Sequence, residues 1–184
     1  MFVQKRNYCF TLFCILLASL LSSCTSMQVN HSQPICLNTC QKIVVLPFTN
    51  MTETPQADER AASMTADLLR TKGMRNVVTY PNKSKPASLI PGVKMPIQRA
   101  RLLAFARRQS ADYAMRGDVT EWNYKVGLDG EPAVGLNLEV IDVYSGQVIW
   151  SAVGSESGGS RSALSEVALN LINSMLKSIK FIRA

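Results

Sequence analysis

The run Ile43-Val44-Val45-Leu46-Pro47 consists of apolar residues without alternation and ends in a proline. Such a continuous run is typical of a strand that is covered on both faces. A helix is expected after it, with Thr54 as its cap and Gly73 at its left-handed end. Between those two residues, apolar side chains recur at three- and four-residue spacing: Ala57, Ala61, Met64 and Leu68. This pattern opens a layered domain of strands and helices.

The remaining chain continues with strand and helix patterns. Strands are predicted at 77–80, 113–126, 134–144 and 148–153, and helices at 98–109 and after Ser160. The last helix carries one unbroken apolar stripe that is expected to face the core: Leu164, Val167, Ala168, Leu171, Ile172, Met175, Leu176 and Ile179. The predicted order is β-α-β-α-β-β-β-α, which gives an α/β fold with a mixed β-sheet and helices packed on it.

The N-terminus has the features of an export signal. Lys5 and Arg6 precede an apolar stretch, 10–21, that is shorter than the roughly 20 residues needed to span a bilayer. It ends in Leu21-Ser22-Ser23-Cys24, which resembles the lipobox of bacterial lipoproteins and implies cleavage before Cys24 and lipidation of its thiol. The sequence therefore predicts a signal peptide over 1–23, a lipidated and irregular tether over 24–41, and a single periplasmic domain over 42–184. By the same resemblance, Thr25 favours the outer membrane.

Two cysteines remain in the exported chain. Cys36 and Cys40 are a candidate disulfide pair in an oxidising periplasm, although their spacing alone does not establish the geometry. A metal site would need more ligands, and His31 is the only histidine of the chain. No metal and no cofactor are therefore expected.

Charge is distributed unevenly along the chain, whose formal net charge is +7. Basic residues dominate 81–116: Lys83, Lys85, Lys94, Arg99, Arg101, Arg107, Arg108 and Arg116. Acidic residues dominate 117–144: Asp118, Glu121, Asp129, Glu131, Glu139 and Asp142. Such asymmetry builds a field across a domain, which suits an anionic membrane surface or a charged polymer. Two ordinary solvated faces are the alternative interpretation, and nucleic acid is not an expected partner of an exported protein.

Nothing in the sequence predicts catalysis. A serine triad would need a base, and His31 lies in the predicted tether. A general acid–base pair needs one buried member, but the pairs Asp118 with Glu121 and Asp129 with Glu131 fall on a strand and a turn, where carboxylates are usually exposed. The two tryptophans allow an interface role as well as a core role. The core is the favoured place for Trp122, whereas Trp150 is an equally good candidate for the core and for a membrane or interface aromatic.

Three stretches carry a resemblance to known proteins. Ile43–Asn50 (IVVLPFTN) and Val143–Trp150 (VYSGQVIW) are similar to matching segments of the domain shared by TolB, the secretin CsgG and the synthase activator LpoB. Gly117–Gly135 (GDVTEWNYKVGLDGEPAVG) resembles the corresponding stretch of the PelC family, the outer-membrane lipoproteins of Pel exopolysaccharide export. The resemblance covers nearly all of 42–184.

This resemblance implies a dodecameric ring held by lipid to the inner leaflet of the outer membrane. An acidic surface of that ring would guide a cationic, partly deacetylated amino-sugar polymer towards the export porin PelB. The residues that would supply the acidic surface are Asp118, Glu121, Asp129 and Glu131. The basic stretch or Trp150 would then face the membrane.

Two other functions stay open. An LpoB-like activator of a peptidoglycan synthase must reach across the cell wall, and a fully extended tether from Cys24 to Ile43 spans at most roughly 65 Å. A CsgG-like secretion or assembly lipoprotein would need lipid-facing strands, and 113–144 carries too many charges for that role.

Overall fold

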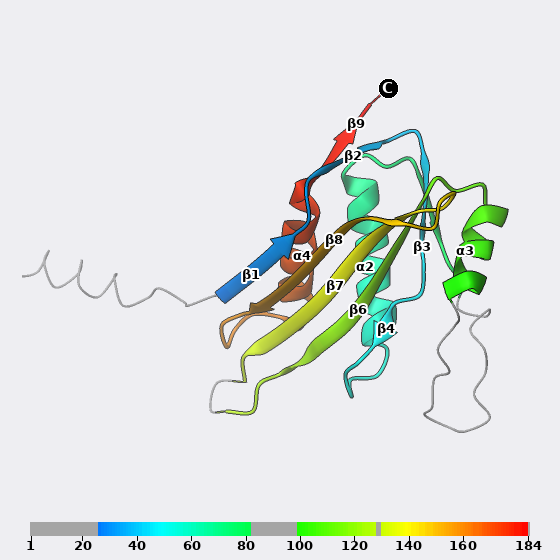
Figure 1. Cartoon of the computed structure of the whole chain (residues 1–184). Helices are drawn as coiled ribbons and strands as arrows, with labels where there is room; N and C mark the ends of the chain where they lie inside the picture. Colours follow the sequence, from blue (N-terminus) through cyan, green and yellow to red (C-terminus); the bar gives the residue numbers. More distant parts are fainter. Residues whose placement is uncertain (1–25, 82–98, 128–129, 184) are drawn as a thin grey trace, which may run out of the picture.

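The computed structural model describes residues 26–81, 99–127 and 130–183. Within them the helices and strands are β1 (Ser26–His31), β2 (Ile35–Asn38), β3 (Lys42–Val45), β4 (Thr49–Asn50), α2 (Ala57–Thr71), β5 (Asn76–Thr79), α3 (Arg99–Arg108), β6 (Tyr113–Tyr124), β7 (Pro132–Asp142), β8 (Val148–Ser157), α4 (Leu164–Met175), the 3-10 helix η2 (Leu176–Ser178) and β9 (Ile179–Ile182). The predicted fold class, α/β with a mixed sheet and packed helices, is confirmed (Figure 1).

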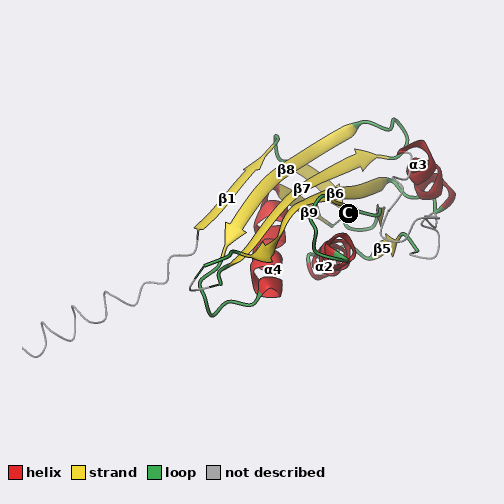
Figure 2. Ribbon diagram, turned by 90° about the horizontal axis from the view of Figure 1, so that it is seen from below, coloured by secondary structure: helices red, strands yellow, loops and turns green. Residues whose placement is uncertain are grey.

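In this part of the chain seven strands form one mixed sheet, in the order β1-β8-β7-β6-β3-β5 with β4 beside β6. β3 is parallel to β5 and β6, and the pairs β6–β7, β7–β8 and β8–β1 are antiparallel. α2 and α4 lie side by side on one face of the sheet, and α3 lies against the other face near one end of it (Figure 2). The face opposite α2 and α4 is therefore covered over only part of its length.

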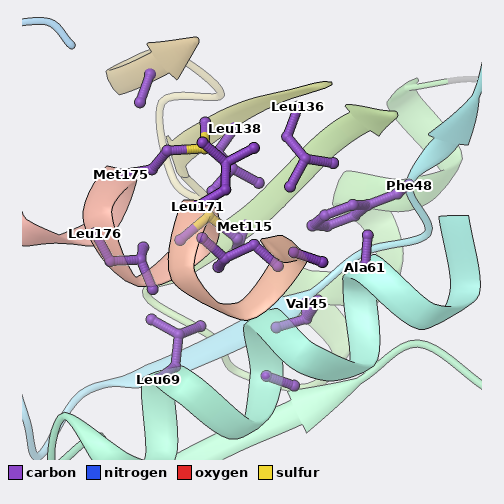
Figure 3. Close-up of a cluster of buried hydrophobic side chains, with 14 of the residues drawn as sticks. Val45, Phe48, Ala61, Leu69, Met115, Leu136, Leu138, Leu171, Met175 and Leu176 are labelled. Atoms are coloured by element: carbon purple, nitrogen blue, oxygen red, sulfur yellow. The ribbon is translucent and has the colours of Figure 1, made fainter. Parts of the chain in front are cut away.

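The apolar run of β3 is buried on both faces, as its lack of alternation predicts. Ile43 and Val45 join the main core beneath α2 and α4, and Val44 joins the smaller core beneath α3. Figure 3 shows the main core, where side chains of β6 and β7 such as Met115 and Leu138 meet Leu171 of α4. β3 lies between β6 and the edge strand β5, and from Ile43 to Val45 it has no polar face.

α2 begins two residues later than a cap at Thr54 predicts. The Thr54 hydroxyl donates a hydrogen bond to the carbonyl oxygen of Trp122 on β6 instead of capping the helix, and the first helical residue is Ala57. Gly73 follows the helix with φ +100°, so the predicted left-handed end is confirmed. α2 consequently packs its small buried residues, Ala57 and Ala61, against the sheet.

The prediction of an irregular tether over 24–41 is wrong for most of its length. Ser26–His31 forms β1 at the edge of the main sheet, and Ile35–Asn38 forms β2. An edge strand is covered on one face only, and in β1 that face needs little more than the half-buried Val29. Because β1 has so few apolar residues, its sequence shows no clear alternation of apolar and polar side chains.

The last helix is shorter than its apolar stripe. The stripe is core, as predicted, but α4 ends at Met175, and Ile179 belongs to β9, which pairs in parallel with β2. Ile179 is buried at the start of β9 and continues the helical spacing of α4 by coincidence. Spacing alone therefore cannot place the end of α4. The described residues include no helix that is both long and apolar enough to cross a membrane.

Candidate functional site: a row of carboxylates on the open face of the sheet

The face of the sheet opposite α2 and α4 is the candidate functional surface, and we call it the open face. α3 covers it where Ala114 of β6 and Ile141 of β7 are buried. Side chains alternate between the two faces of a strand, so Arg116 and Asp118 on β6 and Glu139 on β7 share this face with Ala114 and Ile141. Beyond α3 the open face therefore carries polar side chains.

Carboxylates form a short row across this surface, which we call the acidic row: Asp118, Glu121 and Glu139. Asp118 lies opposite Asn137, and Glu139 lies opposite Arg116, in the antiparallel pairing of β6 with β7. Arg116 Nη2 approaches Asp118 Oδ1 at 3.5 Å, with side chains that are 31% and 22% exposed. Arg116 thus lies beside Asp118 and Glu139, and Glu121 lies further along β6, so this surface keeps more carboxylates than guanidinium groups.

A β-bulge places Glu121 in the acidic row. The register of β6 against β7 shifts between Val119 and Glu121, and Glu121 lies opposite Gly135. An added Cβ at Gly135 would stand 2.6 Å from Thr120 Oγ1 and 3.2 Å from Glu121 Cβ. Glycine is therefore required beneath these two side chains, and the extra residue of the bulge turns Glu121 to the open face.

The structure brings together some of the predicted acidic residues and adds another. Asp118 and Glu121 share the open face, Glu131 lies just before β7 at the hairpin end, and Asp129 falls outside the described residues. Glu139 was not among the candidates. The alternation of Leu138 and Val140 with their neighbours, combined with antiparallel pairing, was the signal that could have placed it beside Asp118.

Hydroxyl and amide groups surround the acidic row. On β8 and β1 the same face carries uncharged polar side chains: Ser151, Ser155, Gln28 and Asn30. Hydroxyls and amides both donate and accept hydrogen bonds, whereas ionised carboxylates only accept them. The open face can therefore bind ammonium groups at the carboxylates and hydroxyl-bearing chains beside them.

The basic residues gather at the other end of this face, on α3. Arg99 Nη2 donates to the carbonyl oxygen of Gly146 at 3.0 Å, and Arg107 Nε donates to that of Val143 at 3.1 Å. Arg101 and Arg108 are exposed on the same helix. Arg116 instead lies among the carboxylates, and Lys83, Lys85 and Lys94 lie outside the described residues. The open face thus has a basic end and an acidic middle.

Of the two places that the sequence allows for Trp150, the structure shows the core, so its candidate role as a membrane or interface aromatic is not supported. Trp150 is 1% exposed on the side of β8 that faces α4, and its Nε1 donates to Ser178 Oγ at 3.0 Å. Trp150 lies opposite Val140 in the regular part of the pairing with β8 and points inward as Ala152 does, whereas the bulge between Val140 and Ile141 leaves Val148 and Ile149 exposed. Trp122 is also 1% exposed, so its predicted place in the core is confirmed.

The two cysteines do not form a bonded pair in the structure. Cys36 lies on β2 and Cys40 in the turn after it, and both thiols are free and exposed. Cys40 N donates to Asn38 Oδ1 at 2.9 Å, which holds the turn without a disulfide. His31 lies on β1, and within the described ranges no three His, Cys, Asp or Glu side chains cluster as metal ligands would.

A cavity of about 280 Å³ opens where β3 and β5 end. It lies between these strand ends and the first turns of α2, so Val45, Thr79, Ser63 and Asp58 are among its lining residues. Carboxyl ends of parallel strands that connect to helices on opposite faces are a frequent place for ligands. The acidic row and this cavity occupy different parts of the molecule.

Glu156 is a buried carboxylate on the helix-facing side of β8. It is 3% exposed, and its Oε2 has no hydrogen-bond partner among the described residues. Burial raises the pKa of Glu156, and the negative charge of Glu166 on α4 raises it further. The folded protein therefore holds this proton more tightly than the unfolded chain does.

Glu156→Gln is expected to stabilise the fold at neutral pH. A carboxyl whose pKa is raised by folding contributes most stability below its ordinary value of 4.5, and that contribution is lost as the pH rises through the folded pKa. A neutral amide avoids the burial of charge, so the unfolding free energy at pH 7 should rise by on the order of 1 kcal/mol.

Urea unfolding of both proteins across the pH range provides the measurement. The difference should close below the ordinary pKa of a glutamate, where the wild-type carboxyl is protonated. Glu53→Gln, at an exposed glutamate, is the matched control and should change stability by less than about 0.5 kcal/mol. An equal effect of both substitutions at every pH would contradict the assignment of a buried charge to Glu156.

No family model and no curated protein sequence matches the chain. Among solved structures, lipoprotein GNA1162 from Neisseria meningitidis has the same fold: the TM-score is 0.52 at 17% identity, over 74% of this chain and 95% of that one. The PelC dodecamer from Paraburkholderia phytofirmans matches with a TM-score of 0.71 at 38% identity, over 83% of this chain and 96% of that one. A PelC variant from the same organism matches with a TM-score of 0.70 at the same identity.

The mixed sheet with two helices on one face is the α/β fold that this chain shares with lipoprotein GNA1162. The relation to the Paraburkholderia protein is much closer than a shared fold, because identity extends over nearly all of that chain. The chain belongs to the PelC family.

Proposed function

We propose that this protein is an outer-membrane-anchored periplasmic lipoprotein that assists export of a cationic exopolysaccharide, as a ring and without catalysis. The observation that carries the proposal is the 38% identity to PelC from Paraburkholderia phytofirmans, a protein solved as a dodecamer. The acidic row supplies a surface on which such a polymer is guided. Its expected partners are further copies of the chain, the inner leaflet of the outer membrane, the polymer and an export porin of the PelB type.

The acidic row is suited to guiding a polymer rather than to holding it. Asp118 is partly exposed, and ion pairs between exposed groups contribute only about 0.2–1 kcal/mol each. Several weak sites repeated around a ring raise the local concentration of a polycation without trapping it. Hydroxyls and amides beside the carboxylates, such as Ser151, offer hydrogen bonds to sugar hydroxyls.

Anchoring depends on Cys24, which lies outside the described residues. Cleavage before this cysteine and attachment of lipid would leave the folded domain at the membrane, with Ser26 already in β1. Two or three acyl chains anchor a protein firmly, whereas one chain binds only weakly. The same arrangement counts against an LpoB-like activator, because a connection of two residues from Cys24 to Ser26 cannot reach across a cell wall.

Native mass spectrometry tests the assembly. The lipidated protein in nanodiscs is expected to give the mass of a closed ring, twelve copies if it matches its relative. The domain from Thr25 onward is measured beside it over a range of concentrations, since the membrane concentrates weakly associating subunits. A monomer in both samples would contradict the ring and would favour a partner-binding module of the LpoB type.

A further inference from the structure

We propose that the end of the sheet at which β1 begins rests against the lipid headgroups, with Tyr124 and Val126 in the membrane interface. The inference rests on the proposed lipidation of Cys24 and adds the orientation of the domain. Figure 1 shows that the start of β1, the end of β6 and the start of β7 lie at the same end of the sheet, with α3 at the other.

Chain length sets the distance between the anchor and the sheet. Ser26 follows Cys24 by two residues, which span at most about 7 Å. Ser26 pairs with Ser157, Ser157 pairs with Ala133, and Ala133 pairs with Asn123. The lipidated residue is therefore held near this row of four paired residues, and the end of β6 lies three strand spacings away, about 14 Å.

The side chains at this end have the chemistry of a membrane interface. Tyr124 is 54% exposed and Val126 is fully exposed. Leu164 N donates to Tyr124 Oη at 3.3 Å, which holds the aromatic ring beside the start of α4. Lys125 and Arg161 are exposed nearby, where their charges can meet lipid phosphates. Tyrosine beside an apolar residue and cations is typical of an interfacial contact.

The opposite end of the sheet also has an exposed aromatic side chain. Comparing the two ends therefore tests the orientation. Tyr144 is 96% exposed, just beyond the last residue of β7, Asp142. At about 3.3 Å per residue, the length of β7 separates it from the Ser26 row by roughly 30 Å. An upright domain cannot bring both ends to the bilayer, whereas a domain lying flat on the open face would do so and would cover the acidic row.

This orientation gives the acidic row a direction. From Asp118 through Glu121, β6 runs towards Tyr124, and Glu131 stands at the same end before β7 begins. A cationic chain that moves along these carboxylates therefore approaches the bilayer, where an export porin would receive it.

Fluorescence quenching by doxyl-labelled lipids tests the proposal on the full, lipidated protein. Val126→Trp and Tyr144→Trp are prepared as a matched pair, since both positions are almost fully exposed. The proteins are reconstituted in vesicles of phosphatidylethanolamine and phosphatidylglycerol. Trp122 and Trp150 are 1% exposed in both variants and give the same background.

The expected result is loss of most of the added fluorescence at position 126 and no loss above background at position 144. Quenching at 144 alone, or equal quenching at both positions, would overturn the proposed orientation. Flotation of the vesicles is measured on the same samples. Protein that does not float has no lipid anchor, which overturns the proposed function together with this inference, whereas floating protein without quenching at 126 overturns the orientation only.

Discussion

Reversal of Asp118, Glu121 and Glu131 to lysine is expected to reduce polymer export by about tenfold or more while leaving the fold intact. Electrostatic guidance changes local concentration and encounter rates by factors of about 10 to 1,000, and reversed charges repel a polycation. The three residues lie on the open face or at its hairpin end, and none of them packs in the core. Secreted polymer from cells that carry only the variant is the measurement.

Two control proteins separate electrostatics from damage to the fold. Asp67→Lys with Glu166→Lys reverses exposed acids on α2 and α4, which cover the other face of the sheet, and should leave export unchanged. Neutral amides at Asp118, Glu121 and Glu131 should give an intermediate loss. Normal export by the lysine variant, with a normal protein level, would contradict a guiding role for Asp118, Glu121 and Glu131.

Trp150→Ala is expected to lower the unfolding free energy by about 3–5 kcal/mol, the cost of truncating a large aromatic side chain in a core. Trp150 is 1% exposed, and its indole connects β8 to η2 through the hydrogen bond to Ser178. Removal of the ring leaves a cavity at this contact and frees the Ser178 hydroxyl. Urea unfolding of the domain followed by circular dichroism gives the value.

The two tryptophans allow a matched comparison of the indole N–H. Trp150 Nε1 donates to Ser178, whereas Trp122 Nε1 is buried without a hydrogen-bond partner among the described residues. Phenylalanine at 150 should therefore cost about 1 kcal/mol more than phenylalanine at 122. Equal losses at the two positions would show that the hydrogen bond to Ser178 contributes little, and a small loss for Trp150→Ala would place the indole outside the core.

Sequence reasoning placed correctly those elements in which the spacing of apolar residues along the chain follows the burial of their side chains. β3 lacks alternation because both of its faces are covered, and the stripe through Leu171 is continuous because α4 lies over the sheet. In each case the burial of neighbouring residues is regular, so spacing along the chain predicts the environment.

Irregular pairing explains most of the rest. Glu121 is an odd-numbered residue of β6, as are the buried Met115 and Val119, and simple alternation would turn it inward. The bulge after Val119 reverses the alternation, so Glu121 reaches the open face and Trp122 enters the core. A second bulge lies at Ile149 and leaves Val148 and Ile149 exposed, whereas Trp150 follows the regular alternation of β8. Bulges depend on the partner strand, and a single strand's sequence does not reveal them.

β1 was missed for a different reason. Its pairing with β8 depends on backbone hydrogen bonds, which any residue except proline can make, so side chains such as Gln28 and Asn30 give little indication of a strand. The acidic row was predicted in part, because the residues were recognised as acidic while Glu139 could be added only once the register of β6 with β7 was known.

The position of β1 also decides how the domain bears mechanical load. A pull on the N-terminal end of the chain enters at Ser26 and acts along β1, whose six residues each pair with a residue of β8. Because the pull runs parallel to the strand, all of these pairs resist together in shear instead of opening one after another. The pairing of β1 with β8 therefore carries the load. The force passes to β8 and α4 before it reaches the carboxylates.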